Sequence, residues 1–254
     1  MIITASNKRI YYEVKGCGEE AVLLHGWGGS VQSFRPVFNR LCEKNRVYAI
    51  DLPGFGRSDP PAANWSTPEY AKLIIETLDN LGLKRPHILG HSFGGRIALY
   101  LAAYYPKRVN KLILVDSAGI RPKRGWGYRF RVGKFKILKR VFSLLGDWGE
   151  EKIQSLYCNA GSVDYRNAGV LRPVLVRAVN EDLTPILDKI TCRTMLIWGE
   201  HDVDTPLGDG QLMHRRISSS QLVVIKNAGH YSYLKNPEYF CETVIDFLHS
   251  SCTN

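Results

Sequence analysis

The sequence predicts an α/β fold in which a mostly parallel β-sheet is covered by helices on both faces. Short apolar runs with the length of buried strands alternate along the chain with helical patterns, and most of these runs end in a turn that contains glycine. Strand, turn and helix in repetition are typical of such a sheet, because parallel strands are joined by crossovers that cover its faces. The length of 254 residues suits one domain of this class.

The predicted strands begin with a hairpin. Two short β-type runs in the first 15 residues flank Ala5-Ser-Asn-Lys8, a pattern that predicts two strands joined by a tight turn. Further strands are expected at residues 21–24, 46–50, 86–90, 111–115, 193–198 and 222–225.

Three helices are indicated by their ends. One begins at Thr67-Pro68-Glu69, where a hydroxyl can cap the helix and proline fits the first turn, and it ends at Gly82. A second follows residues 91–95 and ends at Pro106. The last covers residues 237–249 and carries the apolar side chains Phe240, Val244, Ile245, Phe247 and Leu248.

The alternation is interrupted between residues 119 and 188. This stretch has no clear strand and several helical patterns, one of which places apolar residues three to four positions apart: Phe135, Leu138, Val141, Phe142 and Leu145. We interpret the stretch as a helical cap. The predicted organisation is a core made of residues 1–118 and 189–254, with residues 119–188 as the cap.

The composition excludes several classes of protein. Apolar residues make up 44% of the chain and charged residues 23%, so disorder, collagen and coiled coil are poor interpretations. No stretch reaches the ~18–20 consecutive apolar residues of a membrane-spanning helix. The first residues lack the basic start and long apolar region of a secretory signal. We therefore expect a soluble, cytoplasmic protein with no transmembrane segment.

The cysteines are scattered along the chain, at Cys17, Cys42, Cys158, Cys192, Cys241 and Cys252. They form no Cys-x-x-Cys motif and no paired Cys/His spacing, which a zinc site or a disulfide framework would contain. We expect reduced thiols, most of them buried as small apolar side chains, and no bound metal.

Most of the net charge of +10 lies in one segment. Residues 117–146 contain nine basic side chains and no acidic one. A protein that binds nucleic acid usually carries a broad basic stripe or a recognisable module, so we expect no nucleic-acid partner. The helical part of this segment should pack its apolar face onto the core and turn Lys136, Lys139 and Arg140 outward. That cationic face either keeps the protein soluble or attracts an acidic partner: a carrier protein, an anionic substrate or an anionic membrane surface.

Gly90-His-Ser-Phe-Gly94 matches the pattern G-x-S-x-G, between a predicted strand and a helix rich in small residues. In that context a sharp, strained turn exposes the oxygen of Ser92, and small neighbours let the backbone pass closely. An ordinary glycine turn with an incidental serine is the alternative, which the flanking elements disfavour.

A serine hydroxyl needs a base within hydrogen-bond reach and an acid that orients the base. The candidate base is His230, which follows Gly229 just beyond the strand at 222–225. The remaining histidines except His25 lie inside a strand, next to the serine, or in polar or terminal contexts: His87, His91, His201, His214 and His249.

The candidate acid is Asp202, which follows the strand at 193–198. Its rival is Asp116, which follows the strand at 111–115, because both strand ends face the same crevice of an open sheet. Glu200 and Asp204 are further options on the loop of Asp202.

An oxyanion that forms at the serine needs preorganised N–H donors. We expect the backbone N–H of Phe93, which follows the serine, and that of Trp27 in the loop His25-Gly26-Trp27-Gly28. A phosphate-binding role for this loop is a weak alternative, because the loop lacks both the Lys-Ser/Thr ending and the G-x-G-x-x-G spacing.

Together these residues resemble the α/β-hydrolase superfamily along nearly the whole chain. The motifs occur in the family's order: His25-Gly26, Asp51-x-Pro-Gly-x-Gly56-x-Ser58, the turn at Ser92, Trp198-Gly199-x-x-Asp202 and Gly229-His230. The resemblance implies an eight-stranded sheet and no cofactor. It implies Ser92 as nucleophile, His230 as general base and then acid, and Asp202 as orienting carboxylate. Haloalkane dehalogenases and epoxide hydrolases carry aspartate in place of the serine, so those activities are not expected.

The expected activity is hydrolysis of a carboxylic ester or related acyl bond (EC 3.1) through an acyl-enzyme on Ser92, with a small-molecule acyl substrate. Alternatives that remain open are a thioesterase or esterase for carrier-bound acyl groups, a carbon–carbon bond hydrolase, and a ligand receptor on the same fold. Aromatic residues of the cap either line the acyl pocket or form the cap's own core: Trp126, Tyr128, Phe130 and Phe142.

Overall fold

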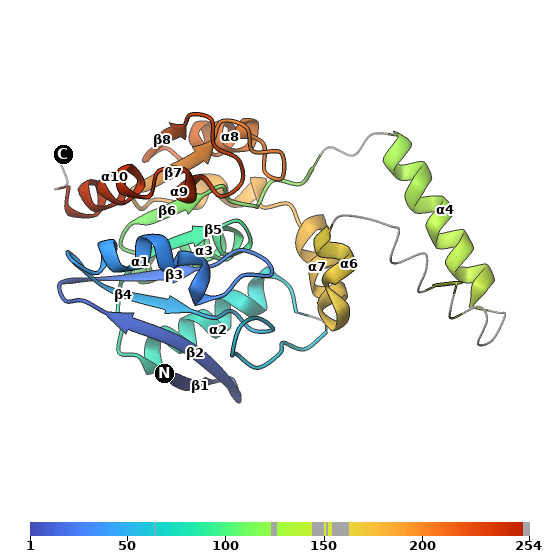
Figure 1. Cartoon of the computed structure of the whole chain (residues 1–254), viewed down its shortest axis with the longest axis horizontal. Helices are drawn as coiled ribbons and strands as arrows, with labels where there is room; N and C mark the ends of the chain where they lie inside the picture. The colour runs from blue at the N-terminus through green and yellow to red at the C-terminus, as the bar shows by residue number, and fades with distance from the viewer. Residues whose placement is uncertain (64, 123–125, 144–149, 151, 154–162, 251–254) are drawn as a thin grey trace.

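The computed structural model describes residues 1–63, 65–122, 126–143, 150, 152–153 and 163–250, and shows a central sheet of eight strands in the order β1-β2-β4-β3-β5-β6-β7-β8 (Figure 1). The strands are β1 Ile2–Ala5, β2 Lys8–Lys15, β3 Glu19–Leu24, β4 Asn45–Ile50, β5 His87–His91, β6 Leu112–Val115, β7 Thr194–Gly199 and β8 Ser220–Ile225. Strand β2 runs antiparallel to β1 and β4, and all other neighbours are parallel. The predicted α/β class with an eight-stranded, mostly parallel sheet is confirmed.

Along the chain, the described helices lie between the strands or after them. They are α1 Arg35–Leu41, α2 Thr67–Asn80, α3 Phe93–Tyr104, α4 Trp126–Phe142, α6 Val163–Asn167, α7 Arg172–Asn180, α8 Leu207–Arg216, α9 Ser232–Lys235 and α10 Pro237–His249. Short 3-10 turns occur at η1 Val31–Phe34, η2 Pro106–Arg108, η3 Gly169–Leu171 and η4 Thr184–Lys189. Each strand expected from the sequence is present to within a residue or two of its predicted ends.

Local chemistry sets the ends of the elements. The predicted hairpin forms, and its two turn residues Ser6 and Asn7 have φ of 47° and 58°, which suit the twist of the joined strands. At the start of α2 the capping hydroxyl belongs to Ser66 and not, as expected, to Thr67. The Ser66 backbone N–H and hydroxyl both donate to Glu69, at 2.8 and 2.6 Å, in a capping box.

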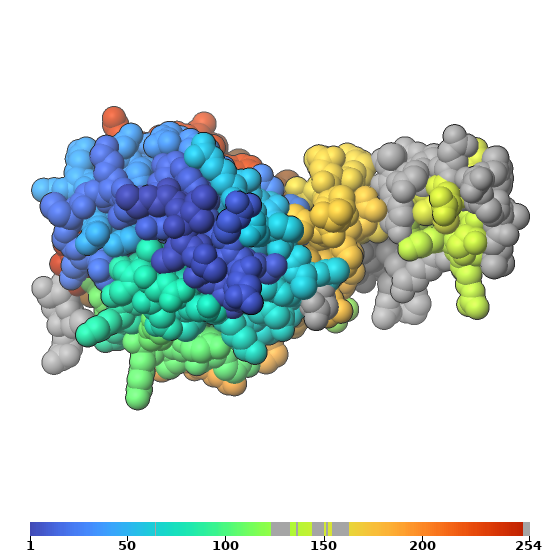
Figure 2. Space-filling model, turned by 90° about the horizontal axis from the view of Figure 1, so that it is seen from below, coloured from blue at the N-terminus to red at the C-terminus, as the bar shows by residue number. Residues whose placement is uncertain are grey.

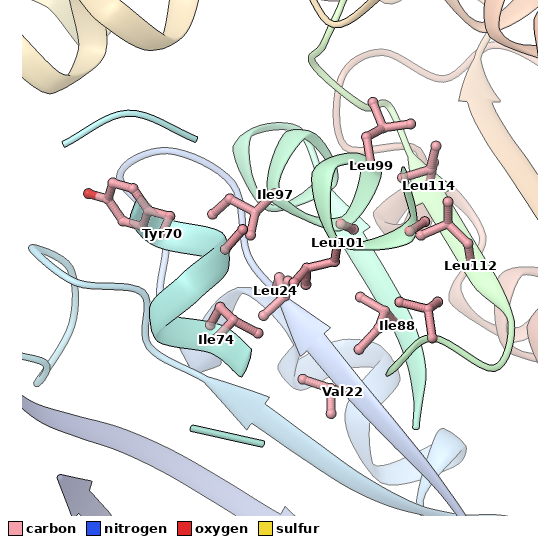
Figure 3. Close-up of a cluster of buried hydrophobic side chains, with 14 of the residues drawn as sticks. Val22, Leu24, Tyr70, Ile74, Ile88, Ile97, Leu99, Leu101, Leu112 and Leu114 are labelled. Carbon is pink, nitrogen blue, oxygen red and sulfur yellow. The ribbon is translucent and has the colours of Figure 1, made fainter. Parts of the chain in front are cut away.

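Alternate side chains of the central strands point to opposite faces of the sheet and form two cores. One face packs against α2 and α3, as Figure 3 shows for Val22, Leu24, Ile88, Leu112 and Leu114 beside Ile74, Ile97 and Leu101. The other face packs against α1 and α10 through Leu23, Leu89, Ile113, Phe38 and Phe240. Helices therefore cover both faces, and the carboxyl ends of the parallel strands are left to form a site.

We call residues 119–188, which connect β6 to β7, the insert. Its described residues form helices and no strand. Its last part is anchored in the core on the α3 side of the sheet through Val174, Ala178, Leu183, Ile186 and Leu187. Helices α6 and α7 lie between the main body and α4 in both views (Figures 1 and 2).

Helix α4 does not pack onto the core as the sequence analysis predicts. It lies apart from the sheet (Figure 1), and Val141 of its predicted apolar face is 49% exposed. The prediction that its apolar face packs onto the core is therefore wrong, because the chain leaves the sheet after β6 and α4 forms beyond α6 and α7. Leu145 of the predicted face lies outside the described residues.

Most of the described cysteines are buried, as the sequence predicts. Of the described cysteines, Cys42, Cys192 and Cys241 are buried and Cys17 is exposed, and these thiols are free. In the part of the chain that the structure describes, no helix is both long enough and apolar enough to cross a bilayer. A cytoplasmic location stays a prediction.

Candidate active site

Ser92 lies in the sharp turn between β5 and α3. Its backbone has φ 49° and ψ −110°, a left-handed conformation that residues with a Cβ rarely adopt. Two glycines make the turn possible: a Cβ on Gly90 would lie 2.5 Å from the carbonyl oxygen of Gly94, and a Cβ on Gly94 would lie 2.0 Å from that of Leu24. The chain can therefore reverse tightly, with the side chain of Ser92 at the carboxyl end of β5.

The structure brings Ser92, His230 and Asp202 together. Oγ of Ser92 lies 2.9 Å from Nε2 of His230, and Nδ1 of His230 lies 2.9 Å from Oδ2 of Asp202. The three residues follow β5, β8 and β7, parallel strands that end at one edge of the sheet. The serine hydroxyl can donate to Nε2 while Nδ1–H donates to the carboxylate, which is the arrangement of a nucleophile with its base and orienting acid.

The surroundings of His230 and Asp202 shift the pKa values of these two residues in opposite directions. Burial lowers the pKa of His230, but the hydrogen bond and negative charge of Asp202 more than offset burial, so the pKa is raised above its ordinary value. Burial raises the pKa of Asp202, but hydrogen bonds from His230 and Thr205 outweigh burial, so that pKa is lowered. Asp202 is therefore ionised at neutral pH, where His230 can accept and return a proton.

Asp116, the rival acid, makes contacts of another kind. Its Oδ1 accepts a hydrogen bond from the backbone N–H of Gly199 at 2.7 Å, and its Oδ2 accepts one from that of Ser232 at 3.0 Å. Asp116 thereby ties the end of β6 to the end of β7 and to the loop after His230. Burial raises the pKa of Asp116 well above its usual range. Of the two carboxylates, the one hydrogen-bonded to the imidazole is that of Asp202.

The two other acidic candidates are exposed on the Asp202 loop. Oε2 of Glu200 accepts from the backbone N–H of Asn227 at 3.0 Å, and the backbone N–H of Asp204 donates to Oδ1 of Asp202 at 2.8 Å. The possible ligand atoms of Asp202, Asp204 and His230 lie within 4.8 Å of one another, although two of these groups are already joined by a hydrogen bond. The absence of a metal and of a cofactor stays a prediction.

The two expected oxyanion donors lie beside the nucleophile. Phe93 is the first residue of α3, and a helix leaves its first N–H groups without a partner inside the helix. The loop that carries Trp27 passes next to Ser92, because a Cβ on Gly26 would lie 3.2 Å from Cβ of Ser92. The rings of Trp27 and Phe93 meet edge to face, with centroids 5.3 Å apart. An oxyanion hole formed by these two N–H groups remains a prediction.

Two buried histidines hold the loops of the site. Nε2 of His25 accepts from the backbone N–H of Leu52 at 2.9 Å, so Nδ1 carries the proton and donates to the carbonyl of Gly26 at 2.7 Å. Nε2 of His91 donates to the carbonyl of His230 at 2.8 Å. Burial lowers the pKa of His25 to about 4 and that of His91 to about 3, so both rings stay neutral and keep these bonds.

Sequence reasoning missed the functions of Thr205 and His91. Oγ1 of Thr205 lies 2.7 Å from Oδ2 of Asp202, 3.0 Å from the carbonyl oxygen of Asp116 and 3.3 Å from Nδ1 of His230. The spacing Asp202-x-x-Thr205 is a usable signal, because aspartate and threonine at such spacing often close a loop with local hydrogen bonds. His91 offers no such signal, since its partner is a backbone carbonyl far along the chain.

The insert contacts the core at Leu171, which packs against Gly54 of the Asp51–Ser58 motif: a Cβ on Gly54 would lie 2.8 Å from the side chain of Leu171. On α6, burial and the negative charge of Asp204 raise the pKa of Asp164, whereas the charge of His230 lowers it. Of the aromatic residues expected to line a pocket, Phe142 is half-buried, and the side chains of Trp126, Tyr128 and Phe130 lie outside the described residues.

Comparisons with known proteins agree with this fold. The family described as alpha/beta hydrolase fold matches residues 22–141, and the family described as TAP-like protein matches residues 176–253. A pimeloyl-[acyl-carrier protein] methyl ester esterase of Neisseria meningitidis serogroup C is 30% identical over 245 residues, covering 91% of this chain and 93% of the relative. The chain belongs to the α/β-hydrolase superfamily.

Two other proteins are similar to this chain over most of its length. A 2-hydroxy-6-oxo-6-phenylhexa-2,4-dienoate hydrolase of Comamonas testosteroni is 27% identical over 259 residues, covering 94% of this chain and 91% of the relative. The solved structure of an esterase from Exiguobacterium antarcticum is 28% identical and superposes with a TM-score of 0.77, covering 98% of this chain and 99% of that one. The relatives are hydrolases, so the chain is a hydrolase of the α/β-hydrolase type.

Proposed function

We propose that the protein is a serine hydrolase that cleaves carboxylic esters or related acyl bonds through an acyl-enzyme on Ser92. The observation that carries this proposal is the continuous path of two 2.9 Å contacts from Ser92 Oγ through the His230 imidazole to the Asp202 carboxylate. The esterase from Exiguobacterium antarcticum supports the ester as the bond that is cleaved.

Acylation follows from the geometry. As Ser92 Oγ attacks the carbonyl carbon, its proton moves to Nε2 of His230, and the ionised Asp202 stabilises the imidazolium through Nδ1–H. The carbonyl oxygen becomes negative and is stabilised by the N–H groups of Phe93 and Trp27, at about 3–4 kcal/mol for each good donor. His230 then returns the proton to the leaving alcohol as the bond breaks.

Deacylation uses the same groups in reverse. Water takes the place of the alcohol, Nε2 of His230 removes one of its protons, and the hydroxide attacks the acyl carbon. The collapse of the second tetrahedral intermediate releases the carboxylic acid and returns the proton to Ser92 Oγ.

The insert supplies the substrate-binding side in this proposal. Residues 1–118 and 189–254 act as the hydrolase core and residues 119–188 as its cap. The support is the contact of the insert's Leu171 with Gly54 of the core motif, where a Cβ would lie 2.8 Å from the Leu171 side chain. The acyl group would then lie between the core and the cap, and the substrate is a small-molecule acyl compound.

A second candidate is an acyl group presented on an acidic carrier protein. The relative from Neisseria meningitidis is a pimeloyl-[acyl-carrier protein] methyl ester esterase. In this chain, nine basic and no acidic residues lie in 117–146, and Lys134, Lys139 and Arg140 of α4 are exposed. A cationic helix that stands away from the core is accessible to an acidic partner, which charge attraction would guide toward the site.

The deciding experiment is turnover of four substrate classes by the purified protein: p-nitrophenyl esters of graded chain length, acyl thioesters, acyl carrier proteins carrying a methyl ester, and a dienoate of the kind cleaved by carbon–carbon bond hydrolases. We expect steady multiple turnover of esters. Preference for the dienoate would assign carbon–carbon bond cleavage instead. A stop after one equivalent of product would favour a ligand receptor.

A further inference from the structure

Arg96 is a buried cation outside the proton relay. It lies on α3, four residues after Ser92, and its backbone N–H donates to the carbonyl of Ser92 at 3.1 Å. The residue is 2% exposed. A buried guanidinium without partners is strongly unfavourable, so its partners indicate what this position does.

Both partners belong to Glu181. One guanidinium nitrogen, Nη1, donates to the Glu181 carbonyl at 3.2 Å and to its Oε2 at 3.2 Å, and Nη2 donates to the same carbonyl at 3.1 Å. The hydroxyl of Thr67, at the start of α2, donates to the same carboxylate oxygen. Glu181 is therefore held by two helices of the core, through its backbone as well as its side chain.

Glu181 is the residue where the insert returns to the core. Helix α7 ends there, and the Glu181 backbone N–H donates to the carbonyl of Arg177 at 3.0 Å. Two residues later, the N–H of Leu183 donates to the carbonyl of Gly119 at 2.8 Å, so the two ends of the insert meet at this point. The charge of Arg96 also faces the carboxyl end of α7, where the helix dipole is negative.

We propose that Arg96 and Glu181 are positioning residues that fix the insert relative to Ser92 and thereby set the binding of large acyl groups. Helix α3 begins directly after the nucleophile. One turn later, Arg96 of this helix donates hydrogen bonds to Glu181 at the end of α7. A rigid link of this kind transmits the position of Ser92 to α7, and through α7 to α6, because Nε of Arg172 donates to the carbonyl of Tyr165 at 3.2 Å. The inference rests on the proposed function, because it concerns the acyl pocket of that site.

The test compares a short and a long ester. Glu181→Ala removes the carboxylate, so Arg96 keeps its two hydrogen bonds to the backbone carbonyl but loses its ion pair, and the end of α7 should loosen. We expect KM for p-nitrophenyl octanoate to rise at least about fivefold with kcat within about twofold, because a loosened pocket loses contacts to the acyl chain that are made equally in the ground state and the transition state. For p-nitrophenyl acetate, which needs only the core, both parameters should stay within about twofold.

Two further variants sharpen the comparison. Glu181→Gln keeps an oxygen acceptor for Arg96 and should restore most of the loss. Asp188→Ala is the matched control, because Asp188 lies at the same end of the insert and pairs with Arg216 on the surface, where its side chain is 58% exposed. Exposed pairs contribute little to stability, so this variant should resemble the wild type with both esters.

Limited proteolysis of the folded proteins is a second readout that does not need activity. Cleavage between residues 119 and 188 should be faster in Glu181→Ala than in the wild type and in Asp188→Ala. Equal loss for both esters, or a lowered melting temperature with unchanged ester preference and unchanged cleavage, would mean that the pair only stabilises the fold and would overturn the inference. If the wild type turned over no ester, the proposed function would fail, and the rate of cleavage would still decide whether the pair holds the insert.

Discussion

Asp202 and His230 are joined by a 2.9 Å hydrogen bond between Oδ2 and Nδ1, although they reach it from the ends of two different strands. The contact is supported from both sides. The hydroxyl of Thr205 lies against the carboxylate, and His91 donates to the backbone carbonyl of His230. Asp116 also accepts hydrogen bonds from the backbone N–H groups of Gly199 and Ser232. The position of the imidazole is thus set by several groups that do not themselves carry the proton.

The first prediction concerns the nucleophile. A fluorophosphonate probe should label Ser92 covalently, and Ser92→Ala should abolish both labelling and esterase activity. Activity well above the ~10³–10⁴-fold over water that an oxyanion hole and binding can supply alone would require another nucleophile. Peptide mapping of the labelled wild type checks the position, and a label on any other residue would contradict the assignment.

The second prediction ranks the two acids. Asp202→Asn should lower kcat by about 10⁴-fold, because the neutral amide no longer holds the imidazole in the required tautomer. Asp116→Asn should cost much less, because Asp116 contacts backbone N–H groups and not the imidazole. Steady-state kinetics of the two variants with one activated ester makes the comparison. The reverse ranking would transfer the role of acid to Asp116.

The third prediction is a pH dependence. His230 must be neutral to accept the serine proton, so kcat/KM should rise with pH as the imidazole loses its proton. Since the hydrogen bond and charge of Asp202 raise the pKa of His230, the midpoint should lie above the ordinary value of 6.5. In Asp202→Asn the effect of burial remains without the opposing charge, and the midpoint should move to lower pH. A flat profile from about pH 5 to 9 in the wild type, with chemistry rate-limiting, would argue against a histidine base.

The fourth prediction concerns Thr205. Thr205→Val keeps the shape of the side chain but removes the hydroxyl beside Asp202 and His230, leaving buried acceptors with one donor fewer. The cost of about 1–2 kcal/mol should lower kcat about tenfold. Thr205→Ser keeps the hydroxyl and serves as the control. If the valine variant had the kcat of the wild type, the hydroxyl would not support the pair.

The fifth prediction concerns the basic face of α4. Attraction between exposed charges is screened within about 8 Å at physiological salt, so guidance of an acidic partner must weaken as salt rises. Between ~0.05 and ~0.5 M salt, kcat/KM for a carrier-bound substrate should fall, while that for a small neutral ester stays nearly constant. Changing Lys136, Lys139 and Arg140 to glutamate should cause the same selective loss, with labelling of Ser92 intact. Unchanged turnover of the carrier-bound substrate after this change would leave the basic face with a role in solubility alone.

Much of the fold and of the candidate site follows from local sequence patterns. Buried strands are short apolar runs, and α2 and α10 carry caps and prolines at their starts, so both kinds of element leave a clear signal. Helix α8 has a weaker local signal and is not predicted from the sequence. It contains two glycines, and its buried residues are Gly210 and Met213, so it is held by packing, with Gly210 close against the ring of Trp198.

The sequence by itself determined the α/β class, the order of the strands along the chain, the turn at Ser92 and the small set of residues from which the site is built. Those features depend on neighbours in sequence: alternation, glycines at close approaches, and polar residues that follow strand ends. Only the tertiary structure decided which of Asp202 and Asp116 contacts the imidazole. It also decided that α4 lies away from the sheet and that Arg96 pairs with Glu181. Each of these depends on distances between groups that are far apart along the chain, and such distances are set by how the strands and helices pack and not by any local pattern.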